Sequence, residues 1–201
     1  NEGIANFDAG SADQYFKRMT AEVLSRVVAM RDLIHQHRIN LHFQPIVHLQ
    51  DRTPHHYEVL LRFEDGRSPF ADVMFAEEIN IVHELDLAVA YGAVSRIQQS
   101  EASGQDLRLA VNMSARQFRL EDLSERVAAI VQRTGVQAQH MVLELTESMV
   151  MQDVDTTRMS LVALKNLGLS LSLDDFGTGY SSLSYLRRFP IDELKIDRSF
   201  I

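Results

Sequence analysis

Apolar residues recur at helical spacing in the first part of the chain. Between Ser11 and His37 they fall at steps of three, four or seven, at Phe16, Met19, Val23, Val27, Met30 and Ile34. This stripe predicts one amphipathic helix. An apolar stripe most often packs on a core, and the alternative is a helix that transmits a signal from an upstream domain.

After residue 40 the pattern changes to short apolar runs that alternate with helical stretches. The runs predict strands at Leu41–Leu49, Tyr57–Phe63, Leu107–Met113, Met141–Leu145, Leu169–Leu173 and Leu194–Ile196. The stretches between them predict helices at Val82–Gln99, Leu120–Arg133, Thr156–Asn166 and Ser181–Arg188. Strands that alternate with helices favour parallel βα units, in a barrel or in a doubly wound open sheet. No Pro/Gly/Ser-rich linker follows Leu41, so one domain is the simpler account.

Composition excludes several classes of protein. The 201 residues are 45% hydrophobic and 24% charged, values typical of a globular domain. A formal net charge of −8 disfavours binding to duplex nucleic acid or anionic lipid. The absence of cysteine excludes disulfides and zinc-thiolate sites and fits the cytoplasm. No apolar run is long enough to span a bilayer, and the start without Met suggests a longer protein with upstream domains.

Polar residues stand where the apolar runs end. They are Glu58 in EVLLR, Asn112 in AVNMS, Glu144 and Glu147 in LELTES, Asp174 and Asp175 in SLDDFG, and Lys195 and Asp197 in LKIDRS. Each alone is typical of an exposed strand or a turn. In a parallel barrel, however, the carboxyl ends of the strands converge, and carboxylates that meet there repel unless cations neutralise them. Oxygen ligands without cysteine favour Mg²⁺ or Mn²⁺ over zinc.

The doublet Asp174-Asp175 is a special case. Neighbouring strand residues normally point to opposite faces of a sheet. The loop from Phe176 to Gly179 offers a way to turn both carboxylates toward one metal site. The alternative is a plain strand-to-helix connection with Ser181 or Ser182 as the helix N-cap.

Histidines and serines carry weaker signals. His35 and His37 are near the end of the first helix, and His55 and His56 are expected in a turn. Without a spaced set of partners, no metal ligation by these histidines is predicted. The serines lack a G-x-S-x-G motif and the chain lacks a phosphate-binding P-loop, so serine hydrolase and nucleoside triphosphatase chemistry are excluded.

Seven ordered motifs resemble the EAL family of cyclic di-GMP phosphodiesterases. They are FQPIV (Phe43–Val47), EVLLR (Glu58–Arg62), FAEE (Phe75–Glu78), VNMSARQF (Val111–Phe118), LELTES (Leu143–Ser148), DDFGTGYSSLSYLRRFP (Asp174–Pro190) and KIDRSF (Lys195–Phe200). The resemblance implies a modified (β/α)₈ TIM-type barrel with one antiparallel strand. It covers an EAL domain at residues 39–201, which an N-terminal helical segment at 1–38 precedes.

The resemblance also implies roles for individual residues. Two divalent ions, Mg²⁺ or Mn²⁺, would be held by Glu58, Asn112, Glu144, Asp174 and Asp175. Glu58, Asp175 and Lys195 would be catalytic, with Lys195 positioning or activating the attacking water, and Glu147 would anchor the Asp174–Tyr180 loop. Substrate contacts would come from Gln44, Leu60, Arg62 and Asp197. The implied reaction is hydrolysis of cyclic di-GMP to linear pGpG, with a homodimer and an upstream sensor or GGDEF domain as implied partners.

Three departures from the family pattern favour keeping an alternative open. The signature reads Glu58-Val59-Leu60 instead of Glu-Ala-Leu, and the segment Glu64–Met74 is short. A full barrel needs eight strands, so we expect the natural protein to continue beyond Ile201 and to supply the C-terminal strands with their Glu and Gln. The alternative function is a non-hydrolytic cyclic di-GMP receptor that signals to a protein partner.

Overall fold

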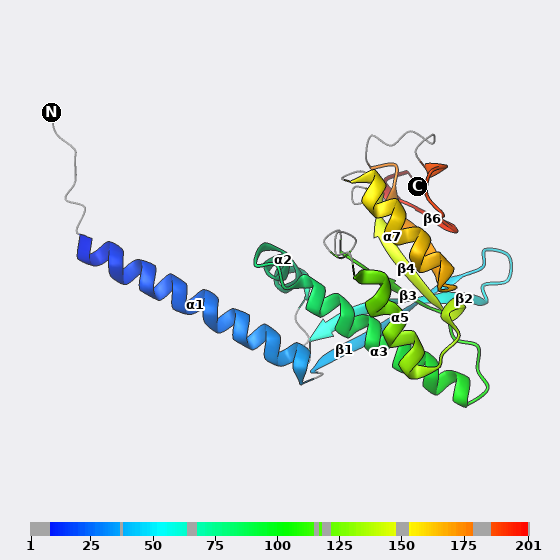
Figure 1. Cartoon of the computed structure of the whole chain (residues 1–201), viewed down its shortest axis with the longest axis horizontal. Coiled ribbons are helices and arrows are strands. Elements are labelled where there is room, and N and C mark those ends of the chain that lie inside the picture. The colour runs from blue at the N-terminus through cyan, green and yellow to red at the C-terminus, as the bar shows by residue number, and fades with distance from the viewer. Residues whose placement is uncertain are drawn as a thin grey trace.

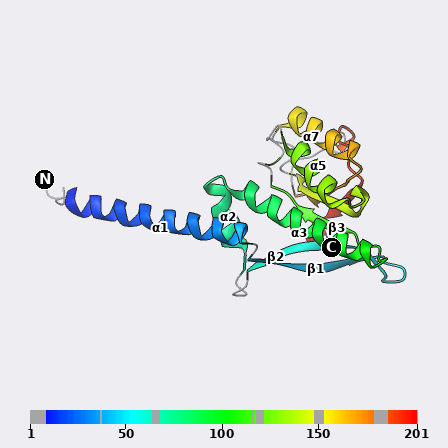
Figure 2. The ribbon, with the colours of Figure 1, turned by 60° about the horizontal axis from the view of Figure 1, so that its bottom comes forward.

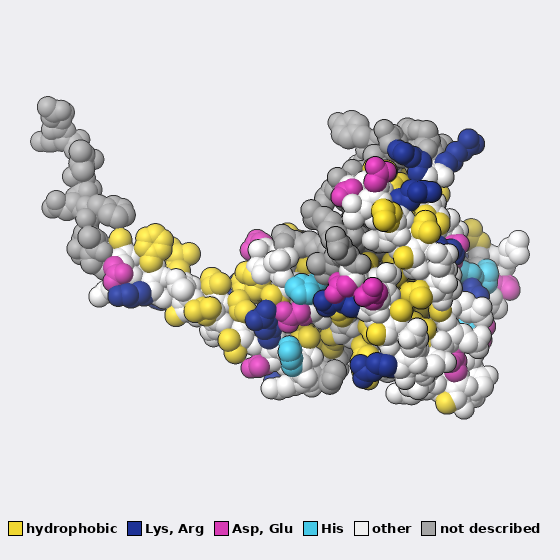
Figure 3. All heavy atoms as spheres, in the orientation of Figure 1, with side chains coloured by type: hydrophobic (Ala, Val, Ile, Leu, Met, Phe, Trp, Pro, Cys, Tyr) yellow, Lys and Arg dark blue, Asp and Glu magenta, His cyan; other side chains and the backbone are white. Residues whose placement is uncertain are grey.

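A computed structural model describes residues 9–36, 38–63, 68–114, 117, 122–147, 153–178 and 186–200. A long helix, α1 (Ala9–His35), projects from an α/β body (Figure 1). Met30 and Ile34 in its second half are buried against the body. Between Tyr15 and Val28 the helix leaves apolar side chains exposed (Figure 3), at Tyr15, Phe16, Met19, Val23, Leu24 and Val28. The predicted helix is thus confirmed, but only part of its apolar stripe is covered.

The strands of the described residues form one sheet in chain order. They are β1 (Ile39–Val47), β2 (Pro54–Phe63), β3 (Leu109–Asn112), β4 (Met141–Thr146), β5 (Ser170–Phe176) and β6 (Glu193–Ile196). β1 is antiparallel to β2, and each later pair is parallel. The expected parallel βα arrangement with one antiparallel strand is therefore present.

Three helices cover one face of this sheet (Figure 2): α3 (Val82–Ala102), α5 (Leu123–Thr134) and α7 (Val154–Asn166). Their apolar sides join the main core, in which the leucine, valine and methionine residues of β3, β4 and β5 are buried. Helices packed against a parallel sheet are typical of βα folds. The edge strands β1 and β6 are far more exposed, so the core is centred on β3 to β5.

Several local expectations differ from the structure. A helix that the apolar pattern did not indicate, α2 (Phe70–Glu78), precedes α3, and short 3₁₀ turns form at Ala138–His140 and Arg198–Phe200. His55 and His56, expected in a turn, are the second and third residues of β2. The turn ends earlier because β1 stops at Val47 and the Asp51 carboxylate caps the backbone of Thr53. Most of the predicted helix at 181–188 lies outside the described residues.

Among the described residues, no helix combines the length and the apolar character that crossing a bilayer requires.

Candidate metal centre at the strand ends

Five neighbouring strands each contribute one polar side chain to a single group on the concave side of the sheet. Glu58 comes from β2, Asn112 from β3, Glu144 from β4, Asp174 from β5 and Lys195 from β6. The register pairs Asn112 with Glu144 on β3 and β4, and Thr146 with Asp174 on β4 and β5. The parallel strands thus bring together residues that are up to 137 positions apart in sequence.

Lys195 is at the centre of the group. Its Nζ donates to Glu58 Oε2 at 3.1 Å, to Glu144 Oε2 at 3.0 Å and to Asp174 Oδ2 at 3.0 Å. Asn112 Nδ2 donates to the other Glu58 oxygen at 3.0 Å. Three carboxylates therefore face one ammonium group, and an excess of negative charge remains.

The carboxylates are spaced and buried in a way that suits a hard cation. Oxygens of Glu58, Glu144 and Asp174 lie within 4.8 Å of one another. Glu144 is fully buried, and no hydrogen-bond partner for its Oε1 is found among the described residues. An unpaired buried carboxylate oxygen is costly, so the donor set fits a divalent ion with oxygen ligands.

Burial and charge shift the pKa values of this group in opposite directions. Burial raises the pKa of Glu144 to about 7, although Lys195 opposes this shift. Burial by itself lowers the pKa of Lys195, but the charges of Glu144 and Glu58 and the hydrogen bonds to Asp174 and Glu144 outweigh burial and raise it above its ordinary value. Lys195 is therefore a protonated hydrogen-bond donor in this arrangement.

Asp175 follows Asp174 but adopts a different backbone conformation. Its φ of 55° is left-handed, and the β5–β6 register shifts between Leu173 and Phe176. This irregularity breaks the strand alternation that would send the two carboxylates to opposite faces. Partial burial and then the charges of Asp174 and Asp197 raise the pKa of Asp175. Asp175 thus lies beside the group but outside the set of three carboxylates that share 4.8 Å.

The loop after β5 is attached to the end of β4. Glu147 Oε2 accepts the Gly177 N–H at 2.7 Å, which is the contact that an anchoring role requires. Gly177 has a φ of 103°, and a Cβ there would lie 2.6 Å from the Phe200 ring. Asp197 Oδ1 accepts the Ser199 N–H at 2.9 Å, and hydrogen bonds from Ser199 lower the pKa of Asp197.

Three of the predicted substrate residues lie on the same face of the sheet as this group. Gln44 is paired with Glu58 across β1 and β2, so both side chains share one face. Leu60 and Arg62 follow Glu58 at alternate positions and share that face too. Arg62 Nη1 donates to the Leu61 carbonyl at 2.7 Å.

One supporting residue was not found from the sequence. Asp86 of α3 accepts the Ser114 N–H through Oδ2 at 2.9 Å, two residues beyond Asn112. Gln117, fully buried, donates from Nε2 to the His83 carbonyl at 2.9 Å. These bonds attach the segment after β3 to α3. The sequence of α3 gives no signal for this role of Asp86, because the role depends on which loop the helix covers.

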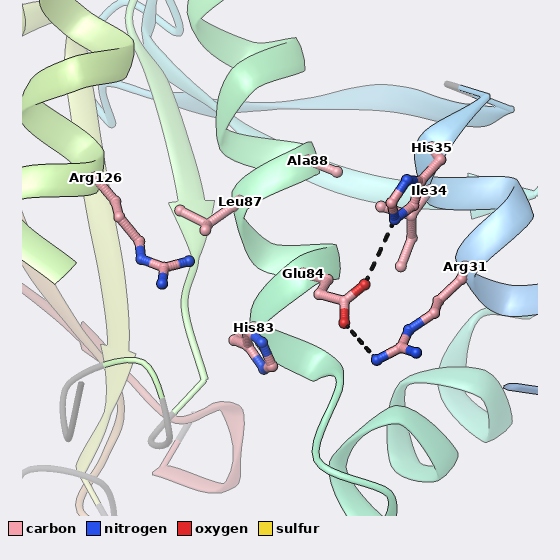
Figure 4. Close-up of a pocket in the computed structure, with 8 residues that line it drawn as sticks. All are labelled: Arg31, Ile34, His35, His83, Glu84, Leu87, Ala88 and Arg126. Carbon is pink, nitrogen blue, oxygen red and sulfur yellow. Dashed lines mark hydrogen bonds and ion pairs between the residues drawn. The ribbon is translucent and has the colours of Figure 1, made fainter. Parts of the chain in front are cut away.

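A separate hollow of about 700 Å³ lies between α1, α3 and α5, as Figure 4 shows. Glu84 on its wall pairs with Arg31 at 3.0 Å and with His35 at 3.7 Å. None of the residues that line this hollow belongs to the strand-end group. The hollow therefore marks how α1 is joined to the body and is distinct from the candidate metal centre.

The fold and the strand-end group define a barrel-type βα domain with a carboxylate cluster suited to divalent cations. The family model described as "EAL domain" matches residues 27–201, and the chain belongs to this family. It is 36% identical over 94% of its length to the cyclic di-GMP phosphodiesterase NbdA of Pseudomonas aeruginosa. It is 35% identical over 90% of its length to MucR of the same species, a bifunctional diguanylate cyclase and cyclic di-GMP phosphodiesterase.

Solved structures agree with the fold. The PaMucR phosphodiesterase in complex with c-di-GMP has a TM-score of 0.81 and 34% identity, and the match covers 88% of this chain and 73% of that one. The Xanthomonas citri FimX EAL domain with c-di-GMP has a TM-score of 0.82 and 25% identity, over 91% and 73%. The predicted TIM-barrel-like fold class is thereby confirmed. The chain spans about a quarter of the length of NbdA and of MucR.

Proposed function

We propose that this domain hydrolyses cyclic di-GMP to linear pGpG with the help of two divalent ions, Mg²⁺ or Mn²⁺. The observation that carries the proposal is the meeting of Glu58, Glu144 and Asp174 within 4.8 Å, with an unpaired buried oxygen on Glu144. Relatives that are named as cyclic di-GMP phosphodiesterases and a related structure with c-di-GMP support it.

The proposed ligands are Glu58, Asn112, Glu144, Asp174 and Asp175. When bound, two such ions polarise the phosphodiester and lower the pKa of the attacking water. The Glu58–Asn112 hydrogen bond fixes the side chains of β2 and β3 toward each other, which limits the reorganisation needed for binding. We expect the left-handed backbone at Asp175 to turn a second aspartate toward the side of Asp174.

Lys195 is proposed to hold the attacking water or a phosphate oxygen. Its ammonium group bonds to three carboxylates from three strands, so its position is fixed from several directions. A protonated amine donates hydrogen bonds and does not remove a proton, which suits a positioning role at this atom. Glu147 holds the loop after β5 through Gly177, and Gln44, Leu60, Arg62 and Asp197 contact the dinucleotide in this proposal.

The proposal extends to the organisation of the protein. Residues 39–201 form the catalytic domain and residues 1–38 a packing and linker segment. The domain acts as a homodimer in the cytoplasm, with a sensor or a GGDEF domain upstream. The pairing of a cyclase with a phosphodiesterase in MucR supports the last point.

Nucleotide analysis tests the proposed reaction. The purified protein is incubated with cyclic di-GMP and either Mg²⁺ or Mn²⁺, with EDTA as control, and the nucleotides are separated by chromatography. We expect metal-dependent pGpG. Glu58→Gln, which keeps the shape and removes the charge, should lower turnover more than about 100-fold, the upper end for residues that only support a metal ligand. Glu125→Gln on the exposed side of α5 is the matched control and should leave turnover unchanged.

Either of two results would overturn the proposal. One is tight binding of intact cyclic di-GMP without product, which would establish a receptor. In that case Val59→Ala, at the buried second position of the signature, would be the first variant to assay for restored hydrolysis. The other is turnover that persists at the wild-type rate in Glu58→Gln.

A further inference from the structure

A second group of potential ligands lies near the starts of β2 and β6. His55 and His56 are the second and third residues of β2, and Glu193 begins β6. His56 and Glu58 are two residues apart on β2, and Glu193 and Lys195 are two residues apart on β6. Alternate strand residues share a face, so His56 and Glu193 form one layer and Glu58 and Lys195 form the next. The 3.1 Å contact between Lys195 and Glu58 shows that these two strands converge on that face.

The three side chains are close enough to hold one ion. One ring nitrogen from each histidine and one carboxylate oxygen of Glu193 lie within 4.8 Å of one another. The Nδ1 atoms of His55 and His56 are 2.7 Å apart, with the rings inclined at 75°. His48 stacks edge-on against His55, with 5.1 Å between ring centroids, and restricts how that ring turns.

Burial sets this group apart from an exposed histidine pair. His56 is 3% exposed, and among the described residues its Nε2 has no hydrogen-bond partner. Buried polar atoms are nearly always satisfied in folded proteins, so an unpaired imidazole nitrogen next to a second imidazole and a carboxylate indicates a ligand. His55 and Glu193 are half-buried, which leaves a path from solvent.

We propose that His55, His56 and Glu193 bind a divalent transition-metal ion of the zinc class. Two imidazoles and one carboxylate are a donor set that Zn²⁺, Co²⁺ and Ni²⁺ prefer, whereas Mg²⁺ prefers oxygen ligands alone. The two groups of this domain therefore differ in their choice of ion. The imidazole nitrogens of His55 and His56 favour a transition metal, and the carboxylates of the strand-end group favour a hard cation.

The bound ion would connect two strands that are not neighbours in the sheet, because β3, β4 and β5 separate β2 from β6. It would hold them together one layer below Glu58 and Lys195. Its role is therefore structural: it stabilises the spacing of β2 and β6 on which the strand-end group depends. A ligand that binds only the folded state raises the stability of that state in proportion to its occupancy.

Cobalt is the probe for this site. Co²⁺ is titrated into the purified protein in a large excess of Mg²⁺, which occupies the strand-end group, and visible ligand-field absorption is recorded. Because the chain has no cysteine, thiolate bands do not contribute. We expect one equivalent of Co²⁺ to bind, and Zn²⁺ to displace it and raise the melting temperature.

Variants assign the binding to these residues. Glu193→Gln and His55→Gln should each weaken Co²⁺ binding at least tenfold, and both are half-buried, so neither opens a cavity in the core. His48→Gln, adjacent to the group but not part of it, should bind as the wild type does, and so should Glu58→Gln. Circular dichroism without metal checks that each variant is folded.

Three outcomes would refute the site. Co²⁺ binding that is unchanged in both Glu193→Gln and His55→Gln places the ion elsewhere. Binding that is lost in Glu58→Gln but not in Glu193→Gln places it in the strand-end group. Absence of ligand-field bands in the wild type means that the two histidines form only a hydrogen bond to each other.

Discussion

Asp86 offers a quantitative test of how α3 supports the strand-end group. It is half-buried, and burial of its carboxyl raises its pKa from 3.8 to about 6, although hydrogen bonds from Ser114 act in the opposite direction. A carboxyl with a raised pKa in the folded state binds more protons there than in the unfolded chain. Stability is therefore lost as pH rises from about 4 to about 6, and the full cost is present above pH 6.

The perturbation is Asp86→Asn, which removes the charge and keeps an oxygen that accepts the Ser114 N–H. A shift of about two units corresponds to about 3 kcal/mol at neutral pH. Loss of a charge-assisted hydrogen bond offsets about 1 kcal/mol of this gain. We therefore expect the variant to be more stable than the wild type by about 2 kcal/mol at pH 7.5. When the linkage relation is integrated over pH, the difference in unfolding free energy between the variant and the wild type should be about 2 kcal/mol smaller at pH 4.5.

Urea unfolding at several pH values between 4.5 and 7.5 measures this difference. Asp155→Asn is the control for loss of one negative charge, since Asp155 is exposed at the start of α7. It should show no such pH dependence. A free-energy difference between wild type and Asp86→Asn that stays constant across this range would refute the argument, because it would mean that Asp86 does not titrate with a raised pKa.

Two further predictions concern the backbone and the attachment of α1. Gly177→Ala should lower the free energy of unfolding by about 1–3 kcal/mol because its φ of 103° is strained for a residue with a Cβ, and that Cβ would lie 2.6 Å from the Phe200 ring. Gly104→Ala, at a φ of 74° with open space around it, should cost less in the same urea titration, and equal losses would contradict a special constraint at Gly177. The coupling energy of Arg31 and Glu84, from a double-mutant cycle with Ala, should be about 0.2–1 kcal/mol and fall with added salt, because Arg31 is half exposed. A coupling that is larger and insensitive to salt would mean that the pair is shielded from solvent.

The spacing of apolar residues along the chain predicted much of the fold. Alternating strands and helices predicted the parallel sheet, because each of β3 to β5 carries buried apolar residues that pack in the core with the helices. The helix α2 was missed because its nine residues are apolar on several sides and give no clear stripe. The end of β1 was misplaced because Leu49 continues the apolar run, yet it is 97% exposed in a turn.

The strand-end group was also anticipated, in part by physical reasoning and in part by resemblance. The carboxyl ends of parallel barrel strands meet at one side of the barrel, so the polar residues Glu58, Glu144 and Asp174 at the ends of the apolar runs were expected to converge. Local sequence does not specify the left-handed turn at Asp175, because that turn depends on the shift of β5 against β6.

The sequence determined features that depend on residues close together in the chain, and it did not determine contacts between residues far apart in the chain. The sequence alone determined which segments are strands and which residue types stand at their ends, because these depend on neighbours a few positions away. Only the tertiary structure decided that Asp86 supports the segment after Asn112, and that Glu193 lies beside His55 and His56. These contacts join residues that no local pattern relates, and they arise from the curvature of the sheet and from which loop each helix covers.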